Sequence, residues 1–255
     1  SDLRGKVGPV SRMPDWAQEV VSCASEAISH TGSIQSAIEE SHKSGTGLVG
    51  DIANSLASID ALCDSAIDGV VFKELLGFDV GQSESLDLVR DVCNDLASQR
   101  TRRDVRLALA AHAPYSVSPA LFRAIRSQAD HARPLSVHLA ESGEELEFLR
   151  TGTGAWRDML ESRGRWDGTW QPFGDGPMAY LEQWGWIASN TLVVHGVHLT
   201  DAELQRLARA GATLVTCPRS NQWTGAGRPP VDRFYGCGAR VAIGTDSLAS
   251  TPDLN

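Results

Sequence analysis

Residues Pro134-Leu135-Ser136-Val137-His138-Leu139-Ala140-Glu141 show how this chain is built. The apolar run from Pro134 to Leu139 predicts a short buried strand, and Gly143 to Arg150 predicts a helix directly after it. A strand followed at once by a helix is the repeating unit of a parallel α/β sheet. His138 and Glu141 stand at the point where the strand ends, so they are candidates for chemistry as well as for structure.

The same unit recurs along most of the chain. The apolar runs predict seven strands, at Thr46–Ile52, Gly69–Leu76, Val105–Ala110, Pro134–Leu139, Thr191–Val194, Ala212–Thr216 and Ala239–Ile243. Helical spacing of apolar residues predicts helices at Pro14–Ser29, Ser33–Ser44, Ser85–Ser98, Ser118–Asp130, Gly143–Arg150 and Asp201–Arg209. This repetition is typical of a parallel barrel or of a doubly wound open sheet.

The position of the polar residues favours the barrel. A candidate polar group follows the C-terminal end of five predicted strands: His112, His138, His195, Cys217 and Asp246. In a barrel these ends share one rim, where active sites form, whereas an open sheet would spread them along an edge. We therefore predict an α/β fold of the (β/α)8 TIM type, formed by residues 1–255 as one barrel domain. Seven strands instead of eight, and a start without Met, lead us to expect a barrel that is incomplete at both ends.

Composition excludes several classes of partner. Lys and Arg total 23 against 32 Asp and Glu, which gives a net charge of −9 and argues against nucleic acid binding. Five scattered cysteines without a CxxC motif indicate reduced thiols and a cytoplasmic protein. A signal peptide and a long apolar span are both missing from the sequence, so we expect no membrane partner.

The segment 151–176 interrupts the pattern. It contains Trp156, Trp166 and Trp170 with several glycines and few aliphatic residues. We interpret it as a loop rather than a core helix, either a surface loop held by aromatic packing or a lid over the substrate.

His138 and Glu141 fit a metal site that activates water. A neutral imidazole at a strand end can bind a divalent ion, and a carboxylate three residues later can reach the proton of the attacking water. An isolated His-x-x-Glu would more simply be a core histidine and a glutamate favoured by a helix N-terminus. The matching motifs at other strand ends favour the metal site.

Two further strand ends supply the remaining candidates. His195 ends an apolar strand, and His198 would face the other way on an extended chain, so we assign His195 to the pocket and His198 to loop structure. Asp246 also ends an apolar run, where a buried carboxylate must be paired, hydrogen-bonded or bound to metal. It is a candidate metal ligand.

For two other polar residues at the predicted rim, His112 and Arg219, the sequence allows two roles each. His112 contacts substrate or stabilises its own loop. Arg219 recognises a substrate anion or pairs with a neighbouring acid, and Ser220 and Asn221 add polar groups beside it. Glu74 lies inside a strand, and we expect it to form a structural pair with Lys or Arg.

Together these motifs resemble the amidohydrolase superfamily, and in particular its aromatic deaminase and chlorohydrolase branch. The resemblance extends from about Asp2 to Ser247 and is carried by five motifs in the order of the family, namely His112-Ala113-Pro114-Tyr115, His138-Leu139-Ala140-Glu141, His195-Gly196-Val197-His198, Cys217-Pro218-Arg219-Ser220-Asn221 and Gly244-Thr245-Asp246-Ser247. Each motif alone is common, and the set is specific.

The resemblance implies a role for each matching residue. His138 would bind one divalent metal ion, zinc or alternatively iron, and Glu141 would carry protons to the leaving group. His195 would orient the attacking water, and Asp246 would bind the metal and accept a proton from that water. His112 and the Ser220–Asn221 segment would contact the substrate.

Family members also use a His-x-His pair on the first barrel strand, which this sequence lacks. By the resemblance this pair would lie just before Ser1, and a small β domain formed by both termini would flank the barrel. Because the family often forms dimers, the resemblance implies a homodimer.

These expectations lead to a metal-dependent hydrolase that acts on C–N bonds other than peptide bonds. Hydrolytic deamination of an aminated heterocycle, a purine or pyrimidine base or a nucleoside-like small molecule, is the reaction that the resemblance implies. Amide-ring or chloro-heterocycle hydrolysis uses the same chemistry, and a non-catalytic barrel that binds a small ligand is the alternative from another class. A serine hydrolase is disfavoured because the chain has no Gly-x-Ser-x-Gly motif.

Overall fold

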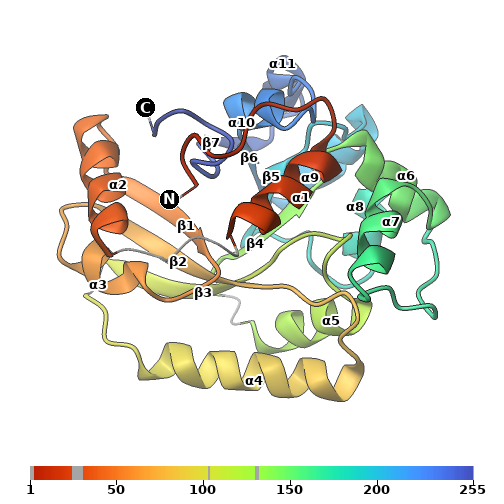
Figure 1. The fold of residues 1–255 in the computed structure, drawn as a ribbon, viewed down its shortest axis with the longest axis horizontal. Helices are drawn as coiled ribbons and strands as arrows, with labels where there is room; N and C mark the ends of the chain where they lie inside the picture. The colour runs from red at the N-terminus through yellow and green to blue at the C-terminus, as the bar shows by residue number, and fades with distance from the viewer. Residues whose placement is uncertain (1–2, 25–30, 103, 130–131, 255) are drawn as a thin grey trace.

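A single sheet of seven parallel strands organises the protein (Figure 1). The structure, a computed structural model, describes residues 3–24, 31–102, 104–129 and 132–254. Within these residues the strands lie side by side in chain order, which confirms the seven predicted strands. They are β1 (Leu48–Ala53), β2 (Asp68–Leu75), β3 (Val105–Ala111), β4 (Leu135–Leu139), β5 (Thr191–His195), β6 (Thr213–Thr216) and β7 (Arg240–Ile243).

Helices connect successive strands and cover the sheet. The described helices are α1 (Met13–Ala24), α2 (Thr31–Lys43), α3 (Ser58–Cys63), α4 (Gln82–Ser98), α5 (Pro119–Gln128), α6 (Gly143–Thr151), α7 (Ala155–Ser162), α8 (Pro177–Glu182), α9 (Asp201–Ala210), α10 (Pro218–Trp223) and α11 (Val231–Gly236). The expected C-terminal ends of two helices, 25–29 and 130, lie outside the described residues. Among the described helices, none has both the length and the apolar character needed to cross a membrane.

The central strands of the sheet, β2 to β5, are largely buried on both faces, as is typical of parallel sheets. Along β2 and β3, side chains of odd number such as Val71 and Leu109 belong to the large core cluster. Phe72, Ala108 and Ala110 point to the opposite face and form a second, smaller cluster. Because successive side chains of a strand alternate between faces, residues of even number on these strands share the inner face of the curled sheet.

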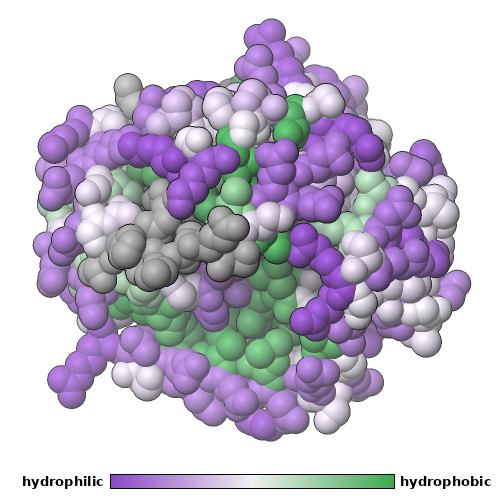
Figure 2. Space-filling model, viewed as in Figure 1, coloured by the Kyte–Doolittle hydropathy of each residue, from purple (hydrophilic) through white to green (hydrophobic). Residues whose placement is uncertain are grey.

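The sheet curls into a half-barrel with two edge strands. β1 and β7 stand at opposite ends of the strand order and do not pair with each other in the described structure. Two large apolar side chains on these edges are exposed, Leu48 on β1 and Ile243 on β7. Figure 2 shows apolar side chains in a hollow in the middle of the viewed face, with hydrophilic residues along the rim where α4 lies in Figure 1.

The segment 151–176 contains a helix, so the expectation of a loop without a core helix is wrong. α7 begins after Gly154, and Trp156 on its first turn is buried and stacks on Tyr115 with ring centroids 3.7 Å apart. Trp170, farther along, is buried and stacks on Phe148 of α6 at 4.8 Å. The aromatic side chains therefore anchor this segment to the core.

Candidate active site

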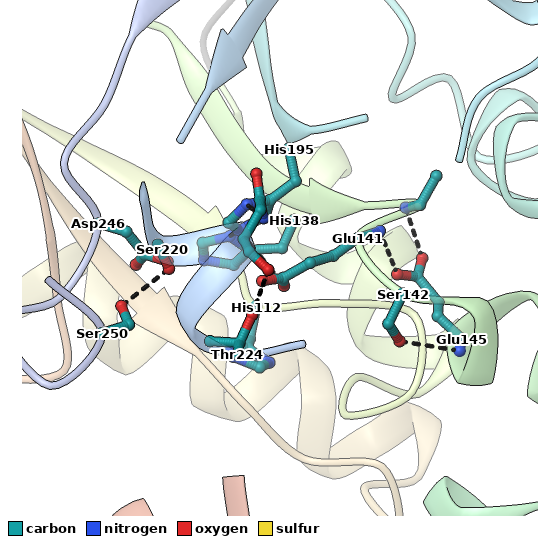
Figure 3. Close-up of polar contacts among 12 residues, drawn as sticks. His112, His138, Glu141, Ser142, Glu145, His195, Ser220, Thr224, Asp246 and Ser250 are labelled. Carbon is teal, nitrogen blue, oxygen red and sulfur yellow. Dashed lines mark hydrogen bonds and ion pairs between the residues drawn. The ribbon is translucent and has the colours of Figure 1, made fainter. Parts of the chain in front are cut away.

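Polar side chains at or just after the C-terminal ends of β3, β4, β5 and β7 converge, as the barrel interpretation predicts (Figure 3). His138 lies on β4, His195 is the last residue of β5, and Asp246 follows β7 by three residues. His112 directly follows β3, and Glu141 lies in the short loop between β4 and α6. The structure thus brings together His112, His138, Glu141, His195 and Asp246, five of the residues that the motifs singled out.

A chain of short contacts joins three of these residues. His138 Nδ1 lies 3.0 Å from His195 Nε2, and the same His195 nitrogen lies 3.3 Å from Glu141 Oε2. On the other side of the ring, the amide nitrogen of Asn221 donates to His195 Nδ1 at 2.9 Å. Because Nδ1 then accepts, a neutral His195 carries its proton on Nε2, the nitrogen that faces Glu141 and His138.

Hydroxyl groups hold the carboxylate of Asp246. Ser220 donates to Asp246 Oδ2 at 2.6 Å and also lies 2.8 Å from the hydroxyl of Ser250. The backbone N–H of Ser247 donates to Asp246 Oδ1 at 2.8 Å. Both oxygens of the carboxylate therefore accept a hydrogen bond, which fixes its orientation in the site.

Backbone strain is concentrated at this site. Among the described residues other than glycine, a positive φ occurs at Ala140 (51°), His195 (75°) and Asp246 (61°). The left-handed region is unfavourable for residues with a Cβ and persists where the surrounding structure enforces it. In a regular strand His195 would share the outward face with Val193, because side chains two residues apart point the same way. The positive φ of His195 at the end of β5 breaks this alternation.

Glu74 also belongs to the site, and the expected pair with Lys or Arg is wrong. Its side chain is buried, Oε1 lies 3.5 Å from His138 Nε2, and Oε2 accepts a hydrogen bond of 2.7 Å from Asn54. The adjacent Lys73 instead donates to the backbone carbonyl of Asn54. Glu74 is an even-numbered residue of β2 and so points to the inner face with Phe72, which is the signal in the sequence that could have placed it here.

The charges of the site are strongly coupled. Burial opposes the charged form of Glu74, yet His112 and the hydrogen bond and attraction to His138 lower its pKa to about 2. Burial also opposes the charged form of His138, yet its contact with Glu74 raises its pKa to about 9. Burial lowers the pKa of His195, which stays neutral. Burial and the nearby Asp246 carboxylate raise the pKa of Glu141 well above its usual value. Although burial opposes ionisation of Asp246, the two imidazoles and the Ser220 hydroxyl hold its pKa below the ordinary range.

The pair of Glu74 and His138 predicts a pH-dependent stability of the metal-free protein. The pKa of Glu74 falls from 4.5 to about 2 on folding, so its stabilisation is present above pH 4.5 and is lost as the pH falls towards 2. The pKa of His138 rises from 6.5 to about 9, so its stabilisation is present below pH 6.5 and is lost as the pH rises through 9. We expect Glu74→Gln to lower the Tm most between pH 4.5 and 6.5.

Thermal unfolding in chelator at a series of pH values measures this difference. Glu84→Gln, which changes an exposed glutamate at the start of α4, is the matched control and should leave the Tm unchanged at every pH. A Tm difference between wild type and Glu74→Gln that does not vary with pH would contradict the pairing.

The remaining predicted residues occupy different places around the site. His112 Nδ1 lies 2.5 Å from the Ser116 hydroxyl, so it stabilises its loop, and its ring also lies 5.2 Å from that of His138.

Arg219 is exposed and pairs with Asp253 at 2.7 Å, which is the pairing with a neighbouring acid that was one of its two alternatives. Ser220 and Asn221 are buried and bind Asp246 and His195, as described above. His198 Nε2 lies 2.8 Å from the carbonyl oxygen of Ala226, which confirms its structural role in the loop.

The donor atoms fit a divalent metal ion. Ligand atoms of Glu141, His195 and Asp246 all lie within 4.8 Å of one another, and a second group with the same property contains Glu74, His112 and His138. Imidazole nitrogen and carboxylate oxygen are the usual ligands of catalytic zinc and of non-haem iron. The two groups are adjacent, because His138 of one group contacts His195 of the other.

The amidohydrolase family profile matches residues 1–255. The chain belongs to the amidohydrolase family. This confirms the resemblance inferred from the five motifs. Among relatives of this amidohydrolase, aminodeoxyfutalosine deaminase of Deinococcus radiodurans is 32% identical over 253 residues, which are 94% of this chain and 59% of the relative. Adenosine deaminase of Helicobacter pylori is 31% identical over 229 residues, which are 88% of this chain and 54% of the relative.

Solved structures of the family have the same fold. Aminofutalosine deaminase of Helicobacter pylori, crystallised with methylthio-coformycin, has a TM-score of 0.87 and 26% identity, covering 99% of this chain and 62% of that one. Atrazine chlorohydrolase of Arthrobacter aurescens, at 21% identity and a TM-score of 0.74, shares the fold. The amidohydrolase chain thus spans between 54% and 62% of the length of these two deaminases and of the solved aminofutalosine deaminase. Its seven strands form the half-barrel of a (β/α) barrel.

Proposed function

We propose that this amidohydrolase is a metal-dependent deaminase of an aminopurine nucleoside or a related aminated heterocycle. The convergence of His138, His195, Glu141 and Asp246 in one site, in which His195 and Glu141 are buried, carries the proposal, because these residues supply both metal ligands and proton carriers. The names of the relatives support the substrate class: they are deaminases of aminodeoxyfutalosine and adenosine. The inhibitor in the related crystal structure, methylthio-coformycin, supports it as well.

His138 and Asp246 are the residues that we propose to hold the metal, with zinc as the first candidate and iron as the second. A divalent ion bound there would lower the pKa of water towards ~7 and so supply a nucleophile at neutral pH. The negative charge of Asp246 and the imidazole of His138 suit such an ion. His195 lies between the two and is held by Asn221, so it is placed to orient water through its Nε2–H.

The carboxyl groups divide the proton transfers between them. In deamination, water attacks the ring carbon that carries the amino group, the C–N bond breaks, and ammonia and a carbonyl compound are formed. Asp246 is ionised and can accept the proton that the attacking water loses. Burial and the Asp246 carboxylate raise the pKa of Glu141, which favours the protonated form that can donate to the leaving nitrogen. The opposite shifts of two neighbouring carboxyl groups are the usual pattern of an acid and a base in one site.

The proposal includes a small-molecule substrate, a cytoplasmic location and a homodimer. All five cysteines are free, which suits a reducing compartment. The net charge of −9 argues against a nucleic acid partner. The homodimer is supported by the family resemblance.

The deaminase proposal predicts ammonia release from an aminopurine nucleoside. The experiment uses the natural full-length protein and tests four compounds in turn. These are aminodeoxyfutalosine, adenosine, S-adenosylhomocysteine and 8-oxoguanine, the substrates in the names of relatives. We expect one of them to yield one ammonia for each substrate consumed, and we expect a chelator to stop the reaction until zinc or iron is added back.

Two results of the same assay would contradict the deaminase proposal. Chloride release from a chlorotriazine, without ammonia from any aminated compound, would indicate a chlorohydrolase. Binding of a nucleoside without turnover, in a preparation that holds metal, would indicate a ligand-binding barrel.

A further inference from the structure

A second glutamate, Glu145, lies directly behind the proposed proton carrier. It stands on the first turn of α6 and its side chain is completely buried. Its Oε1 accepts a hydrogen bond of 2.8 Å from the N–H of Ala140, and its Oε2 accepts one of 2.9 Å from the N–H of Glu141 (Figure 3). One carboxylate thus binds two successive backbone amides of the loop that carries Glu141.

The backbone that Glu145 binds is strained. Ala140 has a φ of 51°, a left-handed conformation that is unfavourable for a residue with a Cβ. The carbonyl oxygen of Ala140 accepts a hydrogen bond of 3.0 Å from the N–H of His198, so both sides of this residue are fixed. With this turn in place, the side chain of Glu141 reaches His195 at 3.3 Å instead of continuing the direction of β4.

Only a carboxylate suits this arrangement among side chains of this length. It offers two acceptor oxygens, whereas glutamine offers one acceptor and one donor, and that donor would face a backbone N–H. Burying a carboxyl group is unfavourable and raises the pKa of Glu145 to about 7, even though the two amide hydrogen bonds lower it. The N-terminus of α6, where Ser142 also accepts a hydrogen bond from the Glu145 N–H at 3.2 Å, partly offsets this cost.

We infer that Glu145 is a positioning residue for the proposed deamination, because it holds the strained Ala140–Glu141 turn and thereby aims Glu141 at His195 and the reacting atoms. The inference rests on the proposed function, in which Glu141 donates a proton to the leaving nitrogen. Glu145 itself does not contact the reacting atoms and acts through Glu141.

Glu145→Gln tests the inference, with Glu144→Gln as the matched control. Glu144 is the neighbouring residue on the same helix turn, and its side chain is 23% exposed and lies 3.6 Å from Arg12 outside the site. A misplacement of about 1 Å costs on the order of 10²-fold in rate. We therefore expect Glu145→Gln to lower kcat by about 10²-fold with KM and metal content unchanged, and Glu144→Gln to behave as wild type. An unchanged kcat in Glu145→Gln would overturn the inference.

A double variant separates positioning from general stability. If Glu145 acts through Glu141, then the double variant Glu141→Gln/Glu145→Gln should be no slower than Glu141→Gln alone. Multiplication of the two single effects would overturn the inference. If Glu145→Gln does not fold, Glu145→Asp takes its place in both experiments, because aspartate keeps the charge but is too short to bind both amides.

Amide hydrogen exchange at Ala140 and Glu141 tests the turn without any activity. We expect slow exchange of both amides in the wild type and fast exchange in Glu145→Gln, with the rest of the protein unchanged. Fast exchange in the wild type would overturn the inference. Slow exchange in the wild type and fast exchange in the variant, in a protein that deaminates nothing, would support the turn and overturn the proposed function instead.

Discussion

Replacing Asp246 by asparagine is expected to remove both the metal and the activity of this protein while leaving its fold intact. The carboxylate is ionised because His195, His138 and Ser220 hold its pKa below the usual range against the effect of burial. Asparagine is neutral, so the site loses its anionic ligand and the base that accepts the proton of the attacking water. Loss of a general base alone costs about 10²–10⁴-fold in rate, and loss of the metal adds to this.

The fold should survive because asparagine tolerates the local backbone. The φ of 61° at position 246 lies in the left-handed region, which asparagine and aspartate occupy more readily than other residues with a Cβ. Asparagine also keeps an oxygen that can accept from Ser220 or from the Ser247 N–H. Metal analysis, ammonia release and thermal unfolding of the same preparation therefore report on the site and on the fold separately.

Asp253→Asn is the control for this prediction. It is the same chemical change at an exposed residue that pairs with Arg219, outside the buried site. We expect it to keep both metal and activity. If Asp246→Asn also kept its metal, the assignment of Asp246 as a ligand would be wrong.

The sequence predicted the parts of the site that depend on strand ends. His138, His195 and Asp246 each follow an apolar run, and in a parallel sheet the C-terminal ends of the strands meet at one edge. The number and order of the strands could be predicted for the same reason, since fully buried strands give apolar runs that stand out in the sequence. These features depend on local sequence and on one topological rule.

The features that the sequence did not reveal depend on contacts between distant segments. Glu74 was expected to pair with Lys or Arg, and it contacts His138 instead. That contact follows from the pairing of β2 with β3 and of β3 with β4, which the local sequence does not show. Ser220 and Asn221 were expected to contact the substrate, and their hydrogen bonds to Asp246 and His195 were not foreseen. In each case the partner is far away along the chain, so local patterns carry no signal for it.

The helix within 151–176 was missed for a different reason. Tryptophan and glycine content indicated a loop, although Trp156, Met159 and Leu160 have the i, i+3, i+4 spacing of a helix. Composition was given more weight than periodicity. The buried stack of Trp156 on Tyr115 shows that periodicity was the better guide.

Replacing Glu141 by glutamine is expected to leave the metal in place and to lower kcat by about 10²–10⁴-fold, the usual contribution of a general acid or base. Burial and the Asp246 carboxylate raise the pKa of Glu141 well above its usual value, which favours the protonated carboxyl group. Glutamine matches that form in size and charge but has no proton to transfer. We expect an unchanged Tm and an unchanged KM, and Glu144→Gln is again the control.

The metal content of Glu141→Gln decides between two arrangements that the structure permits. Ligand atoms of Glu141, His195 and Asp246 lie within 4.8 Å of one another, and so do those of Glu74, His112 and His138. If Glu141 carries protons, its variant holds as much metal as the wild type and is slow. If metal and rate fall together, Glu141 is a ligand, and the ion belongs with His195 and Asp246. In that case His195 would bind the ion through Nε2, because Asn221 occupies its Nδ1, and the proton for the leaving nitrogen must come from a group other than Glu141 and His195.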